Sequence, residues 1–145
     1  MAEWTARDLT RAQGVDGRLV AVIREAVARW RGAEAPTVTE GVRTLARQKE
    51  LVAKGASKTM ASRHLDGMAI DVCMLTPDRK ALVTSTRPYT EFARLVGQVG
   101  NEMGLSIRWG GSWRHISGRE CHDYPYIGAK FFDGPHFEIP KGYEK

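Results

Sequence analysis

The spacing of the apolar residues changes along this chain from a helical period to a period of two and back to a helical period. In residues 16–30 and again in residues 88–103, apolar side chains recur every three or four positions, so each segment carries one apolar stripe on a helix. In residues 68–73, large apolar side chains alternate with smaller or polar ones, which is typical of a half-buried strand. Helices and strands therefore mix without a repeated strand–helix–strand rhythm. This order predicts an α+β fold rather than a parallel sheet.

Shorter segments complete the expected secondary structure. A further helix is expected at residues 45–54, with Leu45, Ala46 and Val52 available for burial. Residues 114–130 have no clear period and predict neither helix nor strand. The whole predicts one small domain with a central, mainly antiparallel sheet flanked by helices. Three short strands belong to this expectation, at residues 37–41, 105–109 and 136–139.

Length and composition exclude several classes of protein. The chain has 145 residues, of which 42% are hydrophobic and 27% charged, as expected for one globular domain. No run of about 18 apolar residues occurs, so no membrane-spanning helix is expected. The first residues lack the apolar core of a secretory signal. Two cysteines, Cys73 and Cys121, fit a reducing compartment and are too few for a four-thiolate zinc site.

The net charge of +5 predicts attraction to polyanions without naming one. Nucleic acid, anionic lipid and an anionic cell-wall polymer all remain candidates. The basic residues are scattered, and no basic stripe with interleaved aromatic residues is present. A nucleic-acid-binding protein is therefore the least favoured class.

The four histidines are candidates for chemistry, because a zinc enzyme of this size needs three protein ligands and one open position. His64 precedes the expected strand, and Asp71 lies within it on the face opposite the large apolar residues. Gly67 permits a sharp backbone path that folds the loop back toward the strand. Imidazole and carboxylate together suit zinc or another borderline divalent ion. The isolated pair is more typical of a surface-loop histidine and an aspartate at the end of a strand.

A second candidate pair is Asp133 and His136. Pro135 keeps Gly134 extended, so a stiff turn separates the two side chains. A carboxylate three residues from a metal ligand is well placed to take a proton from metal-bound water. By itself, the segment is equally consistent with an aspartate that begins a turn and a buried, hydrogen-bonded histidine.

Taken together and in this order, the two halves are much more specific. The chain carries Ser-x-His-x-x-Gly-x-Ala-x-Asp, then Trp-Gly-Gly, then Asp-Gly-Pro-His-Phe-Glu. This pattern resembles the zinc peptidases related to D-alanyl-D-alanine carboxypeptidases. In particular it resembles the phage endolysin branch, the L-alanyl-D-glutamate peptidases that cut peptidoglycan stem peptides. The resemblance covers nearly the whole chain and rests on residues 13–19, 39–44, 47–48, 55–59, 62–71, 109–113 and 132–138.

Residue by residue, the resemblance implies that His64, Asp71 and His136 bind Zn²⁺, at a site on the face of the sheet. Asp133 matches the catalytic carboxylate. That position is usually Glu in the dipeptidase branch, so Asp favours the endolysin branch. Arg43 matches the arginine that faces the substrate carbonyl, a natural partner for a developing oxyanion.

Ser62 matches a residue that lines the metal pocket and contacts substrate. The resemblance implies one zinc peptidase catalytic domain over residues 1–145, without a separate cell-wall-binding domain. The implied activity is hydrolysis of the L-Ala–D-Glu bond of peptidoglycan, leading to bacterial lysis by a phage or prophage endolysin. Two alternatives stay open: a D-Ala-D-Ala carboxypeptidase or dipeptidase with the same metal site, and a non-catalytic zinc-binding module of the same fold.

One departure from the family pattern is the long separation of Trp113 from Asp133. Within the extra residues 114–132, the segment 123–126 resembles the later motif at 133–136, but a Tyr stands where that motif has its histidine. The metal ligand is therefore assigned to His136. Adjacent ligands rarely both reach one ion, so a second metal site is not favoured. A Cys–His nucleophile explains fewer residues than the zinc pattern does. The residues considered for a second metal site or for a Cys–His nucleophile are His115, Cys121 and His122.

The tryptophans raise the question of a stacking platform for a sugar or a base. Trp30 lies on an apolar helix stripe and is expected in the core. Trp109 and Trp113 flank Gly110 and Gly111 and are expected to shape the wall of the site.

The resemblance and the missing secretory signal together predict the place of action. Synthesis in the host bacterial cytoplasm is expected, followed by action on the cell wall after membrane passage. A holin-like pore or delivery on a virion would provide the route. The chain is expected to be a monomer that binds peptidoglycan, with no nucleic-acid partner and no stable membrane insertion.

Overall fold

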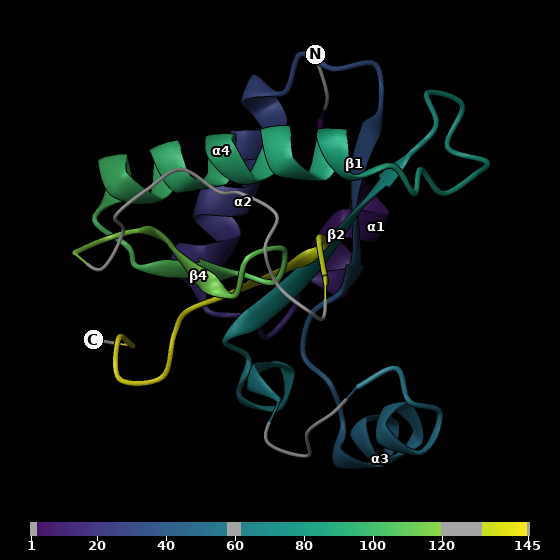
Figure 1. The fold of residues 1–145 in the computed structure, drawn as a ribbon, viewed down its shortest axis with the longest axis vertical. Helices are drawn as coiled ribbons and strands as arrows, with labels where there is room; N and C mark the ends of the chain where they lie inside the picture. Colours follow the sequence, from purple (N-terminus) through teal and green to yellow (C-terminus); the bar gives the residue numbers. More distant parts are fainter. Residues whose placement is uncertain (1–2, 58–61, 120–131, 145) are drawn as a thin grey trace.

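The computed structural model describes residues 3–57, 62–119 and 132–144. In these residues, helices pack against a five-stranded sheet whose pairings are all antiparallel, which confirms the α+β prediction (Figure 1). The strand order is β1-β2-β5-β3-β4. The elements are α1 (Ala6–Arg11), α2 (Gly17–Arg29), β1 (Ala35–Glu40), α3 (Leu45–Ala53), the 3-10 helix η1 (Arg63–Asp66), β2 (Ala69–Leu75), α4 (Thr86–Met103), β3 (Ile107–Trp109), β4 (Arg114–Ser117) and β5 (His136–Glu138).

Strand β5 comes last in the sequence but lies in the middle of the sheet, between β2 and β3. Its antiparallel pairing with β2 places Asp71 directly opposite His136. Its pairing with β3 places Arg108 opposite Glu138. Residues from distant parts of the chain therefore become neighbours on one face of the sheet.

The hydrophobic core lies between the sheet and the two long helices. Helices α2 and α4 pack against each other, and α4 also contacts strands β2, β3 and β4 (Figure 1). Trp30 and Phe137 both meet Phe92 of α4 edge-to-face, with ring centroids 5.8 and 5.9 Å apart. Such pairs add to the burial of apolar area. Trp30 is thus a core residue, as predicted. None of the described helices is long and apolar enough to cross a bilayer.

The two amphipathic helices begin and end close to their predicted positions. The side chain of Asp16 accepts a hydrogen bond from the Arg18 amide and caps α2. Gly104 ends α4 with a φ of 72°, a left-handed conformation that glycine adopts without strain. On β2 the apolar side chains Ile70, Val72 and Met74 are buried, whereas Asp71 points to the other face. The period-two prediction is therefore confirmed.

Three elements differ from expectation. Strand β1 includes Pro36, because β1 is an edge strand, where the missing N–H of proline removes no pairing. Helix α1 is only six residues long, too short for a periodic apolar stripe, and a capping box of Thr5 and Asp8 marks its start. Strand β4 was not predicted, since only its second half, Ile116 and Ser117, is buried.

The predicted burial on α3 is wrong for Leu45 and Ala46, whereas Val52 is half-buried. Leu45 is 55% exposed and Ala46 is exposed, whereas the polar side chain of Gln48 is fully buried. The reason is position: α3 lies away from the other helices (Figure 1), so its inward face meets polar groups rather than the apolar core.

Candidate functional site

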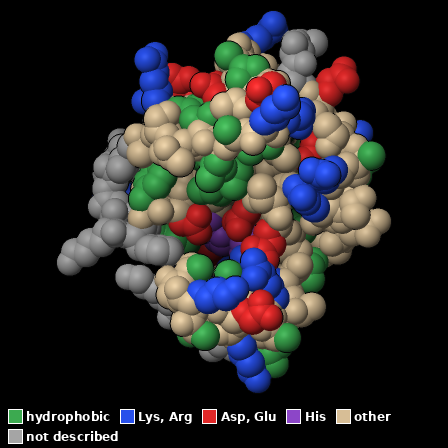
Figure 2. Space-filling view, turned by 90° about the vertical axis from the view of Figure 1, so that its right-hand side faces the viewer, with side chains coloured by type: hydrophobic (Ala, Val, Ile, Leu, Met, Phe, Trp, Pro, Cys, Tyr) green, Lys and Arg blue, Asp and Glu red, His purple; other side chains and the backbone are tan. Residues whose placement is uncertain are grey.

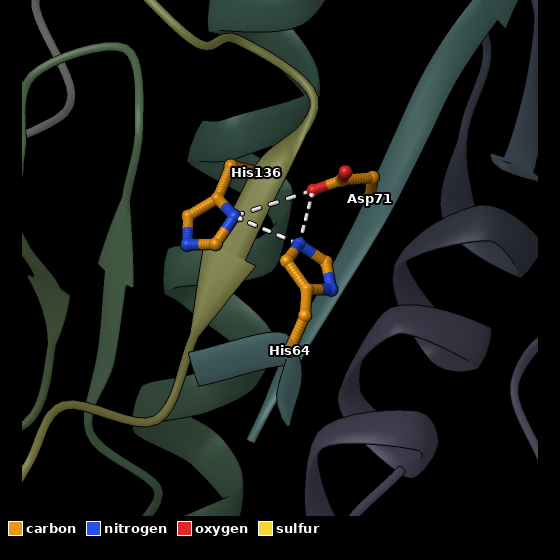
Figure 3. Close-up of side chains that lie close together, drawn as sticks. All are labelled: His64, Asp71 and His136. Atoms are coloured by element: carbon orange, nitrogen blue, oxygen red, sulfur yellow. Dashed lines mark hydrogen bonds and ion pairs between the residues drawn. The ribbon is translucent and has the colours of Figure 1, made fainter. Parts of the chain in front are cut away.

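Two histidines and an aspartate from three separate elements converge on one point (Figure 3). His64 lies on η1, Asp71 on β2 and His136 on β5. Nε2 of His64 is 3.0 Å from Oδ1 of Asp71 and 3.2 Å from Nδ1 of His136. The third side of the triangle, from Nδ1 of His136 to Oδ1 of Asp71, is also 3.2 Å. This cluster can hold a metal ion.

The loop before β2 brings His64 over Asp71. The Ser62 hydroxyl accepts a hydrogen bond from the His64 amide and so caps η1 at its start. Gly67 ends η1 with a φ of 71°, and a Cβ there would lie 2.7 Å from the Gly14 carbonyl oxygen. Only glycine combines this backbone conformation with this close approach. The sharp path expected at Gly67 is therefore present.

A tight turn before β5 positions His136. The His136 amide donates to the Asp133 carbonyl, and the Asp133 amide donates to the Gly110 carbonyl. A Cβ on Gly110 would lie 2.3 Å from the Asp133 carbonyl oxygen, so the two segments touch only because residue 110 is glycine. The indole of Trp109 donates to the Gly134 carbonyl at 2.8 Å. Trp109 is thus a buried support beneath the turn rather than part of the wall.

Each histidine of the cluster uses its outer nitrogen for a hydrogen bond. Nδ1 of His64 lies 2.7 Å from the Gly41 carbonyl oxygen, and Nε2 of His136 lies 2.7 Å from Oε1 of Glu138. Both partners are acceptors, so both outer nitrogens carry the proton. Once both rings are neutral, as metal binding requires, the inner nitrogens present lone pairs toward the point where the three side chains meet. Histidines that ligate metals show this arrangement.

The electrostatics of the cluster favour a positive charge at its centre. Burial raises the pKa of Asp71, but hydrogen bonds with His136 and His64 outweigh it and hold that pKa well below its usual value. Burial lowers the pKa of His136, but the bonds to Asp71 and Glu138 reverse this and raise the pKa to about 10. The groups around His136 thus strengthen its affinity for a proton. Surroundings of this kind attract other cations as well.

Asp133 lies beside the cluster in the same pocket. Burial, and next the charge of Asp71, raise the pKa of Asp133 to about 6, against the opposing effects of His136, His64 and Arg43. Among the described residues, no side chain donates a hydrogen bond to its carboxylate. A carboxylate with a raised pKa and no fixed donor is suited to accept and return a proton near neutral pH.

Arg43 is buried in the pocket wall, where other side chains hold its guanidinium. Nε and Nη2 donate to the two carboxylate oxygens of Glu40. Nη1 donates to Oε1 of Gln48 at 2.7 Å and to the Ser62 hydroxyl at 3.3 Å. Nη2 also lies 3.8 Å from Oδ2 of Asp71. The guanidinium is therefore a fixed positive charge next to the cluster.

The cluster lies at the bottom of a cavity of about 670 Å³, which is large enough for a segment of substrate. Figure 2 shows the hollow, with histidine at its base, acidic side chains at its edge and basic side chains on one side. Trp113 forms part of the wall, as predicted, and its ring lies 5.3 Å from that of His136. Trp113 adopts a positive φ of 54°, an uncommon conformation for a large residue that often occurs at functional sites.

The structure brings all six predicted site residues to this one cavity. The surface-loop interpretation of His64 is wrong, since its side chain is only 2% exposed. Sequence reasoning missed the parts played by Gln48, Arg108 and Glu138. For Glu138, the signal was its position two residues after His136 in a strand, which places both side chains on one face. The predictions for Cys121, His122 and residues 123–126 fall outside the described part of the chain.

The α+β fold, with a cluster able to hold a metal ion and a half-buried carboxylate beside it, defines a small domain with a candidate metal centre of a kind suited to hydrolysis. The family model of the phage L-alanyl-D-glutamate peptidases matches residues 2–139, and the chain belongs to this family. It is therefore an enzyme of the peptidase class.

Two relatives agree with this assignment. The L-alanyl-D-glutamate peptidase of Escherichia phage T5 is 29% identical over 106 residues, which cover 71% of this chain and 74% of that protein. The crystal structure of the L-Ala D-Glu endopeptidase ChiX of Serratia marcescens is similar, with a TM-score of 0.74 and 33% sequence identity. That match covers 95% of this chain and 90% of ChiX.

Proposed function

We propose that this chain is a zinc-dependent endopeptidase that hydrolyses the L-Ala–D-Glu bond of peptidoglycan stem peptides, as a phage or prophage endolysin. The observation that carries the proposal is the triangle of donors formed by His64, Asp71 and His136, with edges of 3.0–3.2 Å. The choice of the L-Ala–D-Glu bond as the cleaved bond rests on the family, since the family and both relatives are named for that bond.

The three donors fit zinc in type and spacing. Two imidazoles and one carboxylate are a common catalytic zinc set, with the fourth position left for water or substrate. For bonds of about 2.1 Å, tetrahedral geometry separates neighbouring ligand atoms by about 3.4 Å. The observed separations of 3.0–3.2 Å need only a small outward movement to reach that value. His64 would bind through Nε2 and His136 through Nδ1.

Within the mechanism, Asp133 is the proposed general base and acid. The chemistry that zinc supplies when bound is polarisation of a carbonyl and activation of water at neutral pH. The Asp133 carboxylate accepts the proton of the attacking water and later returns it to the leaving amine.

Arg43 is the proposed stabiliser of the negative charge that develops on the carbonyl oxygen. Its guanidinium is held in place by Glu40 and Gln48, so no reorganisation is needed when the charge appears. Ser62 is proposed to line the substrate path, although its hydroxyl also caps η1 and accepts from Arg43. Residues 1–145 would then form one catalytic domain.

The decisive experiment is digestion of purified peptidoglycan with and without a chelator. Cleavage at the proposed bond creates new amino-terminal D-glutamate, identified by mass spectrometry. Release of free D-alanine instead would assign the carboxypeptidase activity. Zinc binding without turnover would assign a non-catalytic module. Activity that survives complete removal of metal would refute the zinc proposal.

The proposed partner is the bacterial cell wall, and the proposed state is a monomer. The net charge of +5 supports a weak, salt-sensitive attraction to an anionic wall polymer. Synthesis in the host cytoplasm is proposed, with action after membrane passage. Sedimentation at micromolar concentration and lysis assays from either side of the membrane test these points.

A further inference from the structure

The acidic residue of the substrate poses an electrostatic problem for this cavity, if the proposed function holds. In a stem peptide the chain continues through the γ-carboxyl of D-glutamate, so its α-carboxylate stays free and lies one carbon from the scissile nitrogen. The cavity wall carries four carboxylates, which repel that group. They are Glu40, Asp71, Asp133 and Glu138. A cation of the chain near the leaving-group side would offset this repulsion and favour productive binding.

Two arginines of the wall are already engaged by internal acceptors. The Arg43 side chain is 7% exposed and donates to Glu40, Gln48 and Ser62. The Arg63 side chain is 14% exposed, donates twice to the Ile139 carbonyl and pairs with two carboxylates. Arg43 is already assigned to the carbonyl oxygen of the scissile bond, and turning either guanidinium from its internal acceptors toward a second substrate group would leave those acceptors without donors, which is costly.

Arg108 differs from both. Its side chain is 38% exposed and lines the cavity. Nε donates to the Trp113 carbonyl at 3.0 Å, and the guanidinium lies over the Trp113 ring at 5.0 Å. Nη1 is 3.7 Å from Oε2 of Glu138, an ion pair too long for a hydrogen bond. Among the described residues, the terminal N–H groups of Arg108 have no hydrogen-bond acceptor, while stacking and the Nε bond fix the plane of the group.

Arg108 is also close to the reacting centre. The pairing of β3 with β5 places Arg108 opposite Glu138, and Oε1 of Glu138 is bonded to His136. One carboxylate therefore separates the guanidinium from a residue of the cluster. A planar, pre-oriented guanidinium at this distance matches a carboxylate in two-pronged geometry.

We infer that Arg108 is the specificity residue that binds the free α-carboxylate of the D-glutamate on the leaving side of the scissile bond. The ligand class is an acidic residue in the position after the cleaved bond. Peptides whose D-glutamate α-carboxylate is converted to an amide, as in D-isoglutamine, lose this contact.

The test compares two synthetic stem peptides, one with D-glutamate and one with D-isoglutamine. The wild-type enzyme is expected to favour the acidic peptide. In Arg108→Gln, kcat/KM for the acidic peptide should fall by about 10- to 100-fold, mainly through KM, since a charge-assisted pair is lost. The amide peptide should be affected much less, so the preference collapses. Arg108→Lys should keep part of the preference, because the lysine ammonium retains the positive charge but cannot make the two-pronged contact of a guanidinium.

Lys141, an exposed cation of the same cavity, provides the matched control. Lys141→Gln removes the same charge and should change the preference by no more than about 5-fold, as for exposed ion pairs. Zinc content and circular dichroism of Arg108→Gln should equal those of the wild type.

Each other outcome has a distinct meaning. Equal losses on both peptides in Arg108→Gln would overturn the inference, as would collapse of the preference in Lys141→Gln alone. Loss of zinc in Arg108→Gln would assign Arg108 to support of the cluster instead. Failure of the wild type to cut either peptide would refute the proposed function itself.

Discussion

Replacing Glu138 by Gln tests whether the cluster depends on the group behind it. The Oε1 atom of Glu138 lies 2.7 Å from Nε2 of His136, and both side chains are 7% exposed. Glutamine keeps the shape and one acceptor oxygen but removes the charge. A hydrogen bond to a charged partner contributes about 1.5–3 kcal/mol and a neutral one about 1 kcal/mol. The change therefore removes about 0.5–2 kcal/mol from the orientation of His136.

That loss corresponds to roughly 2- to 30-fold weaker zinc binding, because each 1.4 kcal/mol is a factor of ten. Competition with a zinc-binding fluorescent chelator at fixed pH measures the dissociation constant directly. Glu102→Gln removes an equal charge from an exposed ion pair with Arg29 and serves as the control. Zinc affinity of Glu138→Gln within twofold of the control, in a folded protein, would refute the claim that Glu138 orients His136.

The remaining predictions concern the other parts of the site. Asp133→Asn should lower peptidoglycan hydrolysis by about 10²- to 10⁴-fold with full zinc content by elemental analysis, and a fully lytic variant would exclude Asp133 as the base. His136→Ala should bind no zinc in the same analysis, and a stoichiometric ion would move the site elsewhere. Zinc at a hundredfold excess over its dissociation constant should raise the melting temperature by roughly 5–10 °C in wild type and not in His136→Ala. Gly110→Ala should lose about 1–3 kcal/mol of unfolding free energy in urea, because its Cβ would lie 2.3 Å from the Asp133 carbonyl oxygen, whereas Gly17→Ala meets no atom within 4 Å and should be neutral.

Local patterns were sufficient for the long helices and for β2, the longest strand. The apolar stripe predicted α2 to within a residue at each end. The alternation around Ile70 predicted β2 and the outward direction of Asp71. The same logic misplaced the inward face of α3. Periodicity reports which face of a segment is apolar, and the buried face of α3 is polar at Gln48.

The residues of the candidate site were predictable only as a pattern of types and order. His64, Asp71, His136 and Asp133 stood out through a resemblance that spans most of the chain, since neither half of the motif was decisive alone. Their roles as ligands and base remain predictions. Their meeting in one cavity is a property of the fold.

The sequence by itself therefore determined the two long helices, the faces of β2 and the resemblance to the family. Only the tertiary structure decided that Asp71 lies opposite His136, that the Gly41 carbonyl and Glu138 hold the outer nitrogens, and that Arg108 stays open to the cavity. The physical reason is that strand register depends on pairing between segments about 65 residues apart. No local propensity encodes such pairing, because it follows from which faces can be buried together.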